Sequence, residues 1–521
     1  MSVVFPRCRA ICPVSLMTLL CLFLSYTTLE AQRYPTGEVF DAEVYNALPL
    51  KAKVSTRSIL PPRVSLEQYT PTPGDQGAFM TCSAWSSAYH FRTIIEAKQR
   101  GITDRTQIDK LTFSPTWVYE ILKSEDDNSC GGGLMTAKTL LVFKELGVPS
   151  YSSLPFTCLA GSQQERFSQL DPLMEEAARA RIRDLQILFL AKEGVDPQEK
   201  IQAIKKVLAE GYPVLISHTL YDSFHSAEEV WYTQAGEDQA SDRHGSHAMV
   251  IVGFDDDKYG GAFRYMNSWG SNWGDNGFIW VPYATTGKLC YGAYQAFPFA
   301  PQAPPAPAPV PAPAPAPAPT PAPAPAPPPP PPVAASLPAG SLDFVLRSGE
   351  AMPVSRVSTR NLIVEDDVVP VSTYRMQTAY PSGTRFRFYL NTETEGYVYA
   401  LATDLSGKIN QIFPYAPGVS PLVGSSSVIA FPADDKVIRM DNQAGTDYLL
   451  VLFSQQALDL PAIKRDMDAL SGGLTERLGK VLGKALVDPG QVQYEAGRAG
   501  FRVRTGATGT VVPLMVAIEH L

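Results

Sequence analysis

Apolar residues recur along this chain with two different spacings, and the change from one to the other divides its first half. The earlier spacing is helical, and each helical segment is followed by a glycine that ends it. These helices are expected at residues 82–100, 135–146 and 196–210, before Gly101, Gly147 and Gly211. The later runs are short and bounded by glycine and aspartate, as strands are. These strands are expected at residues 214–217, 247–254, 263–267 and 278–281.

The last third of the chain is predicted to be rich in strands. Residues 385–390 and 397–402 have the pattern of strands and are joined by a Thr-Glu-Gly turn. One helix with a continuous apolar face is expected at residues 463–482. Residues 341–521 are therefore predicted to form a β-rich α+β domain, in which no catalytic constellation is visible. Its further strands are expected at residues 428–431, 448–453, 501–504 and 511–518.

Residues 301–332 are almost entirely proline and alanine, a composition that cannot build a core and favours polyproline II. We interpret residues 301–340 as a linker, which reaches about 100 Å when its proline-rich part is extended. The chain of 521 residues is too long for one ordinary core, so we expect two folded units that move as tethered bodies. A spacer is favoured over a ligand for proline-recognition domains, because no flanking specificity residue stands out.

The N-terminus has the pattern of an export signal. Arg7 and Arg9 precede an apolar run at residues 14–24, and a polar stretch then ends near Ala31. Cleavage after Ala31 is expected, which makes residues 1–31 the signal peptide. The alternative is a retained signal anchor, which the short apolar run disfavours. After signal removal no segment is long and apolar enough for a stable membrane span.

Composition narrows the classes of partner. An apolar share of 45% fits ordinary globular cores. The net charge of -8 and the absence of a Lys/Arg cluster argue against nucleic acid as a partner.

The cysteines predict one disulfide and one reactive thiol. Signal removal takes away three of the seven cysteines and leaves Cys82, Cys130, Cys158 and Cys290. In an oxidising compartment one disulfide is expected among the last three, and Cys130 with Cys158 is favoured because both flank one predicted helix. A zinc site is disfavoured, because no Cys-x-x-Cys spacing occurs.

Four residues stand in the order that peptide hydrolysis by a thiol requires: Gln76, Cys82, His247 and Asn267. Cys82 opens a predicted helix, and the positive end of the helix dipole favours the thiolate that attacks. His247 begins an apolar strand that can hold its imidazole against the thiol as acid and base. Asn267 follows the next strand and can orient that imidazole, while Gln76 can offer its side-chain amide to an oxyanion.

With these residues the chain resembles the papain-like cysteine peptidases over most of the part before the linker. The block from Asn267 to Phe278 is the most specific match. Further motifs that carry the resemblance are Gln76-Gly77, Ser114-Pro115, Cys130-Gly131-Gly132-Gly133 and Pro213-Val214. The resemblance implies an α+β, two-lobed domain at residues 67–300, with a helical lobe, a β-barrel-like lobe and a cleft between Cys82 and His247.

The resemblance also implies where a peptide would lie. Gly132 and Gly133 would offer backbone groups to an extended peptide. Trp269 would keep water from the bond between the histidine and the asparagine. The residues implied for the main specificity pocket are Met135, Ser217 and Ala248.

Three departures from the family pattern bear on the cleft. Phe79 stands where the family has the usual disulfide partner of Cys130. The separation of Cys82 and His247, 247 − 82 = 165 residues, exceeds the ~130–150 residues typical of the family, which predicts inserted helical material at residues 171–193. The stretch of residues 32–75 is shorter than the inhibitory propeptide of the family, so inhibition by that route is not expected. Residues 32–66 are instead interpreted as an N-terminal extension or short prosegment.

These observations predict a secreted, periplasmic or cell-surface bacterial peptidase that acts on peptides or proteins and requires neither cofactor nor metal ion. The domain after the linker resembles a bacterial domain of unknown function that is appended to diverse enzymes, and its partner is left open. Two alternatives stand beside this prediction. One is a degenerate peptidase fold that serves as a binding module, and the other is a thiol acyl transferase or amidase.

Overall fold

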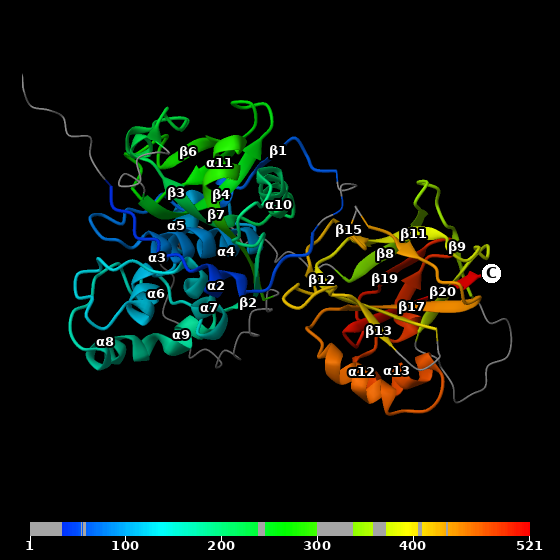
Figure 1. Cartoon of the computed structure of the whole chain (residues 1–521). Helices are drawn as coiled ribbons and strands as arrows, with labels where there is room; N and C mark the ends of the chain where they lie inside the picture. The colour runs from blue at the N-terminus through cyan, green and yellow to red at the C-terminus, as the bar shows by residue number, and fades with distance from the viewer. Residues whose placement is uncertain are drawn as a thin grey trace, which may run out of the picture.

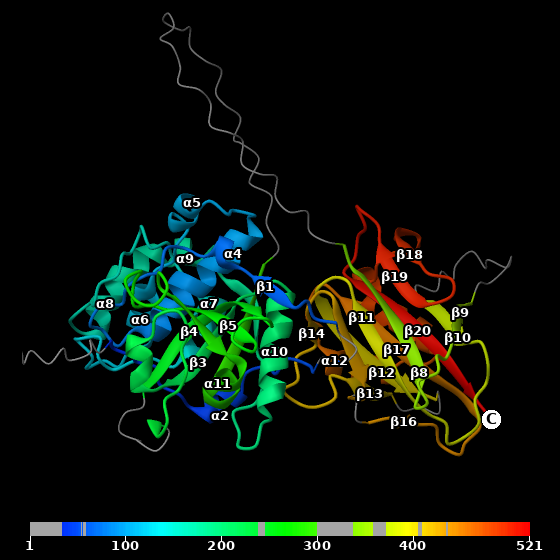
Figure 2. The same cartoon turned by 90° about the horizontal axis from the view of Figure 1, so that it is seen from above.

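The computed structural model describes residues 34–53, 55, 59–237, 245–299, 337–357, 371–404, 409–433 and 436–521. The predicted signal peptide and most of the predicted linker lie outside these residues. Two folded bodies lie side by side in both views (Figure 1, Figure 2). In the described part of the chain, no helix is both long and apolar enough to cross a membrane.

The first body contains a helical lobe, whose helices α6 to α9 gather on one side of it (Figure 1). The expected helix at residues 82–100 is present as one continuous run with a π-helical centre, and Gly101 ends it with φ 67°. Ser162 and Glu165 form a capping box at the start of α8. The helical segments up to this point are α2 (Ala42–Asn46), α3 (Cys82–Ala84), η2 (Trp85–Arg92), α4 (Thr93–Gln99), α5 (Arg105–Asp109), α6 (Pro115–Leu122), α7 (Thr136–Glu145), α8 (Gln163–Leu170) and α9 (Met174–Ala178). Short 3-10 turns are η1 (Glu67–Tyr69), η3 (Asp171–Leu173) and η4 (Asp222–Ser226).

The second lobe of this body is an antiparallel sheet with the order β2-β7-β3-β4-β5-β6, to which β1 adds on β4. Its strands are β1 (Arg63–Ser65), β2 (Ile182–Ile187), β3 (Val214–Leu220), β4 (Gly245–Asp255), β5 (Ala262–Met266), β6 (Phe278–Pro282) and β7 (Cys290–Pro298). The helices α10 (Pro197–Ala209) and α11 (Tyr283–Leu289) pack against it. The four predicted strands are confirmed. The prediction of helical material at residues 171–193 is wrong after residue 178, because β2 pairs there with β7.

The second body is a sandwich of two sheets with the predicted excess of strands. The sheet β13-β12-β17-β20-β10-β9, with β14 on β12, faces the sheet β15-β11-β8-β19-β18, with β16 on β11. Apolar side chains of both sheets fill the space between them. The strands are β8 (Ala339–Leu346), β9 (Val354–Arg356), β10 (Ser372–Met376), β11 (Arg385–Thr392), β12 (Gly396–Thr403), β13 (Asn410–Phe413), β14 (Leu422–Val423), β15 (Ser427–Phe431), β16 (Ile438–Arg439), β17 (Gly445–Ser454), β18 (Val492–Tyr494), β19 (Ala499–Val503) and β20 (Val511–His520).

Two details of the second body differ from the sequence prediction. The strands β11 and β12 are joined by a short turn but belong to different sheets, so they do not pair with each other. The single helix expected at residues 463–482 is two helices, α12 (Leu460–Asp468) and α13 (Leu474–Leu482), because Gly472 and Gly473 interrupt the run. Both helices pack their apolar faces on the outer side of the β12-β17-β20 sheet. The turns η7 (Gly483–Ala485) and η8 (Pro489–Gln491) follow.

The expectation of two tethered bodies is wrong, because the bodies are packed together through polar contacts. The stretch of residues 47–53, directly after α2, reaches the second body (Figure 1). In this stretch the Leu50 N–H donates to Gly418 O at 2.7 Å and the Ser420 N–H donates to Leu50 O at 2.8 Å. Gln186 Nε2 also donates to Ser420 Oγ at 2.7 Å. This stretch is therefore part of the interface.

A buried charge cluster lies at the same interface. Lys51 Nζ and Glu210 Oε2 are 2.9 Å apart, and both side chains are almost completely buried. Lys206 approaches the other oxygen of Glu210 at 3.7 Å, and Ser427 Oγ of the second body donates to that oxygen at 3.1 Å. Two lysines and one hydroxyl therefore share one carboxylate.

We expect Glu210→Ala to lower the free energy of unfolding by about 3 to 5 kcal/mol, because it leaves buried lysines without a counter-charge. The matched control is Glu199→Ala, which breaks the exposed pair of Lys53 and Glu199 and is expected to cost less than about 0.5 kcal/mol. Denaturant unfolding of the two variants measures the difference. Equal losses of unfolding free energy in the two variants would contradict the stabilising role of the buried cluster.

Candidate active site

Cys82 lies at the first position of the helical run α3-η2-α4, directly against the start of β4. Its side chain is fully buried, and it is a free thiol. Ser86 Oγ donates to Ala248 O at 2.8 Å, and the Cys82 sulfur receives a backbone hydrogen bond from Ala248. The cysteine is therefore held beside the residue that follows His247.

His247 and Asn267 are joined by a hydrogen bond in the interior of the protein. His247 Nε2 and Asn267 Oδ1 are 2.8 Å apart, and the Ser268 N–H also donates to this oxygen at 2.8 Å. Because Oδ1 accepts both bonds, Nε2 carries the proton of the neutral imidazole. Nδ1 then holds a lone pair, and it is buried without a hydrogen-bond partner among the described residues. Trp269 covers the imidazole, with ring centroids 4.8 Å apart.

Burial keeps both members of the candidate catalytic pair, Cys82 and His247, neutral in this state. Burial raises the pKa of the Cys82 thiol to about 12, and the nearby Glu38 carboxyl adds to the rise. Burial also lowers the pKa of His247 to about 3, against a smaller opposing effect of the Asn267 hydrogen bond. A thiolate-imidazolium pair is therefore disfavoured as long as this site stays dry.

The side-chain amide of Gln76, which the sequence predicts to be an oxyanion donor, is hydrogen-bonded on both sides in this structure. Its Oε1 accepts a hydrogen bond from Ser268 Oγ at 2.6 Å, which fixes the amide orientation. Its Nε2 lies 3.2 Å from Pro35 O, 3.2 Å from Thr36 O and 2.8 Å from Phe79 O. The first two acceptors belong to residues 34–40 near the N-terminus, so carbonyl groups of the chain itself occupy this donor.

The N-terminal segment, residues 34–40, lies in the cleft across the candidate catalytic residues. Tyr34 stacks on Trp269 at a centroid distance of 4.7 Å, and Trp269 Nε1 donates to Pro35 O at 3.0 Å. The Leu134 N–H donates to Gly37 O and the Val39 N–H donates to Leu134 O, each at 2.9 Å. Inhibition was not expected from a stretch as short as residues 32–75, but a few of its extended residues already lie across the cleft.

Two residues implied for peptide binding, Gly132 and Gly133, already have hydrogen-bond partners inside the first body. The N–H groups of Gly132 and Gly133 donate inside the protein, to Asp127 Oδ2 at 3.1 Å and to the Tyr119 hydroxyl at 3.2 Å. The extended segment pairs with Leu134, so peptide binding by Gly132 and Gly133 stays a prediction. Gly133 is nevertheless needed for close approach, because its φ is +72° and a Cβ would lie 2.4 Å from Gly37 O.

Of the three residues implied for the main specificity pocket, Ser217 makes a hydrogen bond to the segment of residues 34–40. Ser217 Oγ donates to Glu38 Oε1 at 2.7 Å, so this residue does line an occupied pocket. Ala248 is buried beside His247, and Met135 stands at the N-cap of α7. Sequence reasoning missed Glu38 and Thr136, because neither belongs to a motif.

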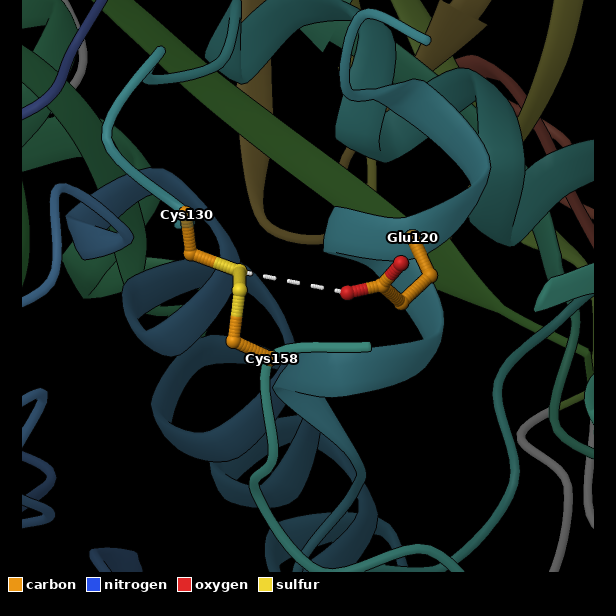
Figure 3. A group of neighbouring side chains, drawn as sticks. All are labelled: Glu120, Cys130 and Cys158. Carbon is orange, nitrogen blue, oxygen red and sulfur yellow. Dashed lines mark hydrogen bonds between the residues drawn. A yellow bond between two sulfur atoms is a disulfide. The ribbon is translucent and has the colours of Figure 1, made fainter. Parts of the chain in front are cut away.

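The structure joins Cys130 to Cys158 by a disulfide, the pair that the sequence favoured. Figure 3 shows the Glu120 carboxylate pointing at it, with Oε1 3.9 Å from the Cys130 sulfur. These groups do not make a metal site, because sulfurs bonded to each other are not thiolate ligands and Glu120 is paired with Lys123 at 2.8 Å. Phe79, which stands in place of a cysteine, packs its ring on Phe156.

Comparisons with known proteins agree with this arrangement. Residues 75–297 match the family described as papain family cysteine protease, and residues 379–457 match a Domain of unknown function (DUF4384). A peptidase C1-like protein of Acanthamoeba polyphaga mimivirus is 26% identical over 218 residues, 40% of this chain and 63% of that protein. A cathepsin B-like protein of Giardia intestinalis is 26% identical over 213 residues, with the same two coverages of 40% and 63%. The chain thus spans less than two thirds of the length of these relatives.

Among solved structures, xylellain, a cysteine protease from Xylella fastidiosa, has 20% identity to this chain and a TM-score of 0.39. The match covers 52% of this chain and 99% of that one. The first body, with its helical and sheet lobes, is therefore similar to the cysteine proteases of the papain family. The match to the papain family and the DUF4384 match that follows it confirm both resemblances found in the sequence.

Proposed function

We propose that this protein is an exported cysteine peptidase that hydrolyses peptide bonds through a Cys82 thioester. The observation that carries this proposal is the extended peptide in the cleft, because Gln76 Nε2 contacts its carbonyl oxygens. The orienting bond between His247 and Asn267 lies in the same site. The segment thereby occupies the groups that a substrate would use.

Each step of the proposed reaction is assigned to a residue of this site. The His247 Nδ1 lone pair accepts the Cys82 proton, and the thiolate attacks the peptide carbonyl carbon. The Gln76 amide and the Cys82 backbone N–H stabilise the oxyanion. His247 then gives the proton to the leaving amine, and a water deprotonated by His247 hydrolyses the thioester. Asn267 keeps the imidazole oriented throughout.

The closed cleft makes the protein latent in this proposal. Substrate enters only after residues 34–40 have left, and water that enters with it relieves the burial that raises the Cys82 pKa. Export is supported by the disulfide of Cys130 and Cys158, since such bonds persist in oxidising compartments. A mature N-terminus near residue 32, found by N-terminal sequencing of exported protein, would support this part.

A mixed peptide library tests the proposed function. We expect the full chain at pH 8 to cleave it, and the Cys82→Ala chain to leave it intact. Cleavage by both proteins, or by neither, would contradict the proposal. Binding of library peptides without cleavage would favour the degenerate binding module, and transfer of the acyl group to added amines in place of water would favour an acyl transferase.

We expect Asn267→Ala to lower kcat by about 100-fold with little change in KM, because a misdirected imidazole slows proton transfer without weakening peptide contacts. The matched control is Asn276→Ala. This asparagine is exposed, and its side chain bonds only Asp275 among the described residues. Steady-state kinetics on one cleaved peptide separates the two parameters. A rise in KM alone would contradict the orienting role.

A further inference from the structure

Glu38 places its side chain in a closed pocket between the two lobes. The residue is 7% exposed, and the side chains that touch its carboxyl are fully buried. Ser217 Oγ of β3 donates to Oε1 at 2.7 Å. Ser83 Oγ of α3 lies 2.6 Å from Oε2, and Thr136 Oγ1 of α7 is also hydrogen-bonded to Oε2. Hydroxyl groups from three separate elements therefore converge on one carboxyl.

The pocket is positioned to select one side chain of an extended peptide. Leu134 bonds the backbone on both sides of Glu38, at Gly37 O and at the Val39 N–H. This register aims the Glu38 side chain into the pocket. Two residues earlier, Thr36 O meets the Gln76 amide. The distance from pocket to oxyanion donor is thus set by the fold and would apply to any peptide in the cleft.

The hydroxyls of the pocket can serve either a carboxylate or a neutral group that donates at Oε2. Thr136 Oγ1 lies 3.1 Å from Ser83 Oγ, and Ser83 Oγ lies 3.0 Å from Leu134 O. Each hydroxyl has one proton, which it can give to Oε2, as to a carboxylate, or along the chain from Thr136 to Ser83 and from Ser83 to Leu134. In the second arrangement the group at Oε2 donates, as a carboxylic acid or an amide NH2 does.

The charge balance of the pocket favours the arrangement with a neutral group. Burial raises the pKa of Glu38 to about 7, although hydrogen bonds from the hydroxyls of Ser83, Thr136 and Ser217 oppose the rise. Other titratable groups that face the carboxyl are the Cys82 thiol and the Tyr291 and Tyr294 phenols, whose pKa values all lie above the ordinary range. All three are neutral near pH 7, so none of them supplies a positive charge.

We infer that this pocket selects glutamine or protonated glutamate in the substrate, with Ser83, Thr136 and Ser217 as the specificity-determining residues. The inference rests on the proposed peptidase function. A leucine in the pocket leaves buried hydroxyls unpaired, and a lysine brings a cation without a buried carboxylate. Glutamine accepts from Ser217 and donates on its other side at any pH, whereas glutamate does so only when it is protonated.

The first test does not depend on catalysis. It measures the rate at which iodoacetamide alkylates Cys82 in the full chain at pH 8. Glu38→Gln is expected to protect Cys82 at least as well as the native residue. Glu38→Leu is expected to speed alkylation about tenfold, since hydroxyls lose their partner. Thr136→Val combined with Glu38→Leu is expected to restore protection, whereas Thr139→Val, one helical turn away and bonded to Thr136 O, is not. Equal rates in all variants would overturn the inference.

The second test is the substrate profile of the Glu38→Ala chain on a position-scanned peptide library. One position at a fixed distance from the cleaved bond is expected to be enriched in glutamine at pH 8 and in both glutamine and glutamate at pH 5.5. Ser217→Val is expected to shift that position towards aliphatic residues. Cleavage with an apolar or basic preference overturns the pocket inference and leaves the peptidase function standing. If no Cys82-dependent cleavage occurs but the alkylation rates of the variants keep their expected order, the peptidase function is overturned and the chemistry of the pocket is still supported.

Discussion

Cys82→Ala is expected to lower kcat/KM for a cleaved peptide by about four orders of magnitude or more, because the nucleophile acts as a unit with its base. His247→Ala should cost about as much, and the double variant little more than either single change. The orienting bond from His247 Nε2 to Asn267 leaves only Nδ1 to take the thiol proton, which is the physical reason for this non-additivity. Peptide cleavage by the full chain at pH 8 measures it.

Cys290→Ala is the matched control for Cys82→Ala. Cys290 is the other free thiol among the described residues and is equally buried, but its sulfur contacts Gly292 O within β7 rather than the cleft. Its replacement should leave kcat/KM within about twofold of the native value, since it touches no reacting group. If the loss of kcat/KM in the double variant equals the product of the losses in Cys82→Ala and His247→Ala, the two residues do not act in a shared step.

The second large effect is expected from Glu38→Arg. This change places a cation in a buried pocket that offers only hydroxyls. The segment of residues 34–40 should therefore leave the cleft, and both peptide cleavage and Cys82 alkylation should rise by about 100-fold, the equivalent of roughly 3 kcal/mol of lost docking. Glu43→Arg, an exposed change on the adjacent α2, should leave both rates close to native. Unchanged cleavage in Glu38→Arg would contradict latency by this segment.

Closure of the cleft should also depend on pH through Glu38. Its pKa is raised from 4.5 to about 7 in the closed state, so the closed state binds the proton more tightly than the open state does. This contribution to closure is fully present below about pH 4.5 and is lost as the pH rises through about 7. The ratio of Cys82 alkylation rates in native and Glu38→Gln chains should therefore rise over this range. A constant ratio would contradict the linkage.

The sequence predicted those parts of the fold and site that rest on local signals. The contact of His247 with Asn267 follows from two strands that each carry a short motif, and glycines at 101, 147 and 211 stop the helices before them. All three have the positive φ that this role requires. Chain order and local spacing were sufficient for these features.

Features that depend on distant pairing could not be predicted. The turn between β11 and β12 has a strong local signal, but the strands part into two sheets because each finds its partners far along the chain. Glu38 carries no motif, and its place follows from the parallel pairing of its segment with Leu134. The packing of the two bodies rests on the burial of Lys51 and Glu210 against Ser427, which no spacing in either domain encodes.

Labelling of the full chain with an epoxide that alkylates peptidase thiolates tests the catalytic account most directly. We predict that mass spectrometry of the digested protein finds one adduct, on Cys82, and that Glu38→Arg speeds its formation while His247→Ala abolishes it. Cys290, which lies away from the cleft, should stay unmodified. No adduct on Cys82, or equal labelling of Cys82 and Cys290, would contradict the assignment of Cys82 as the nucleophile.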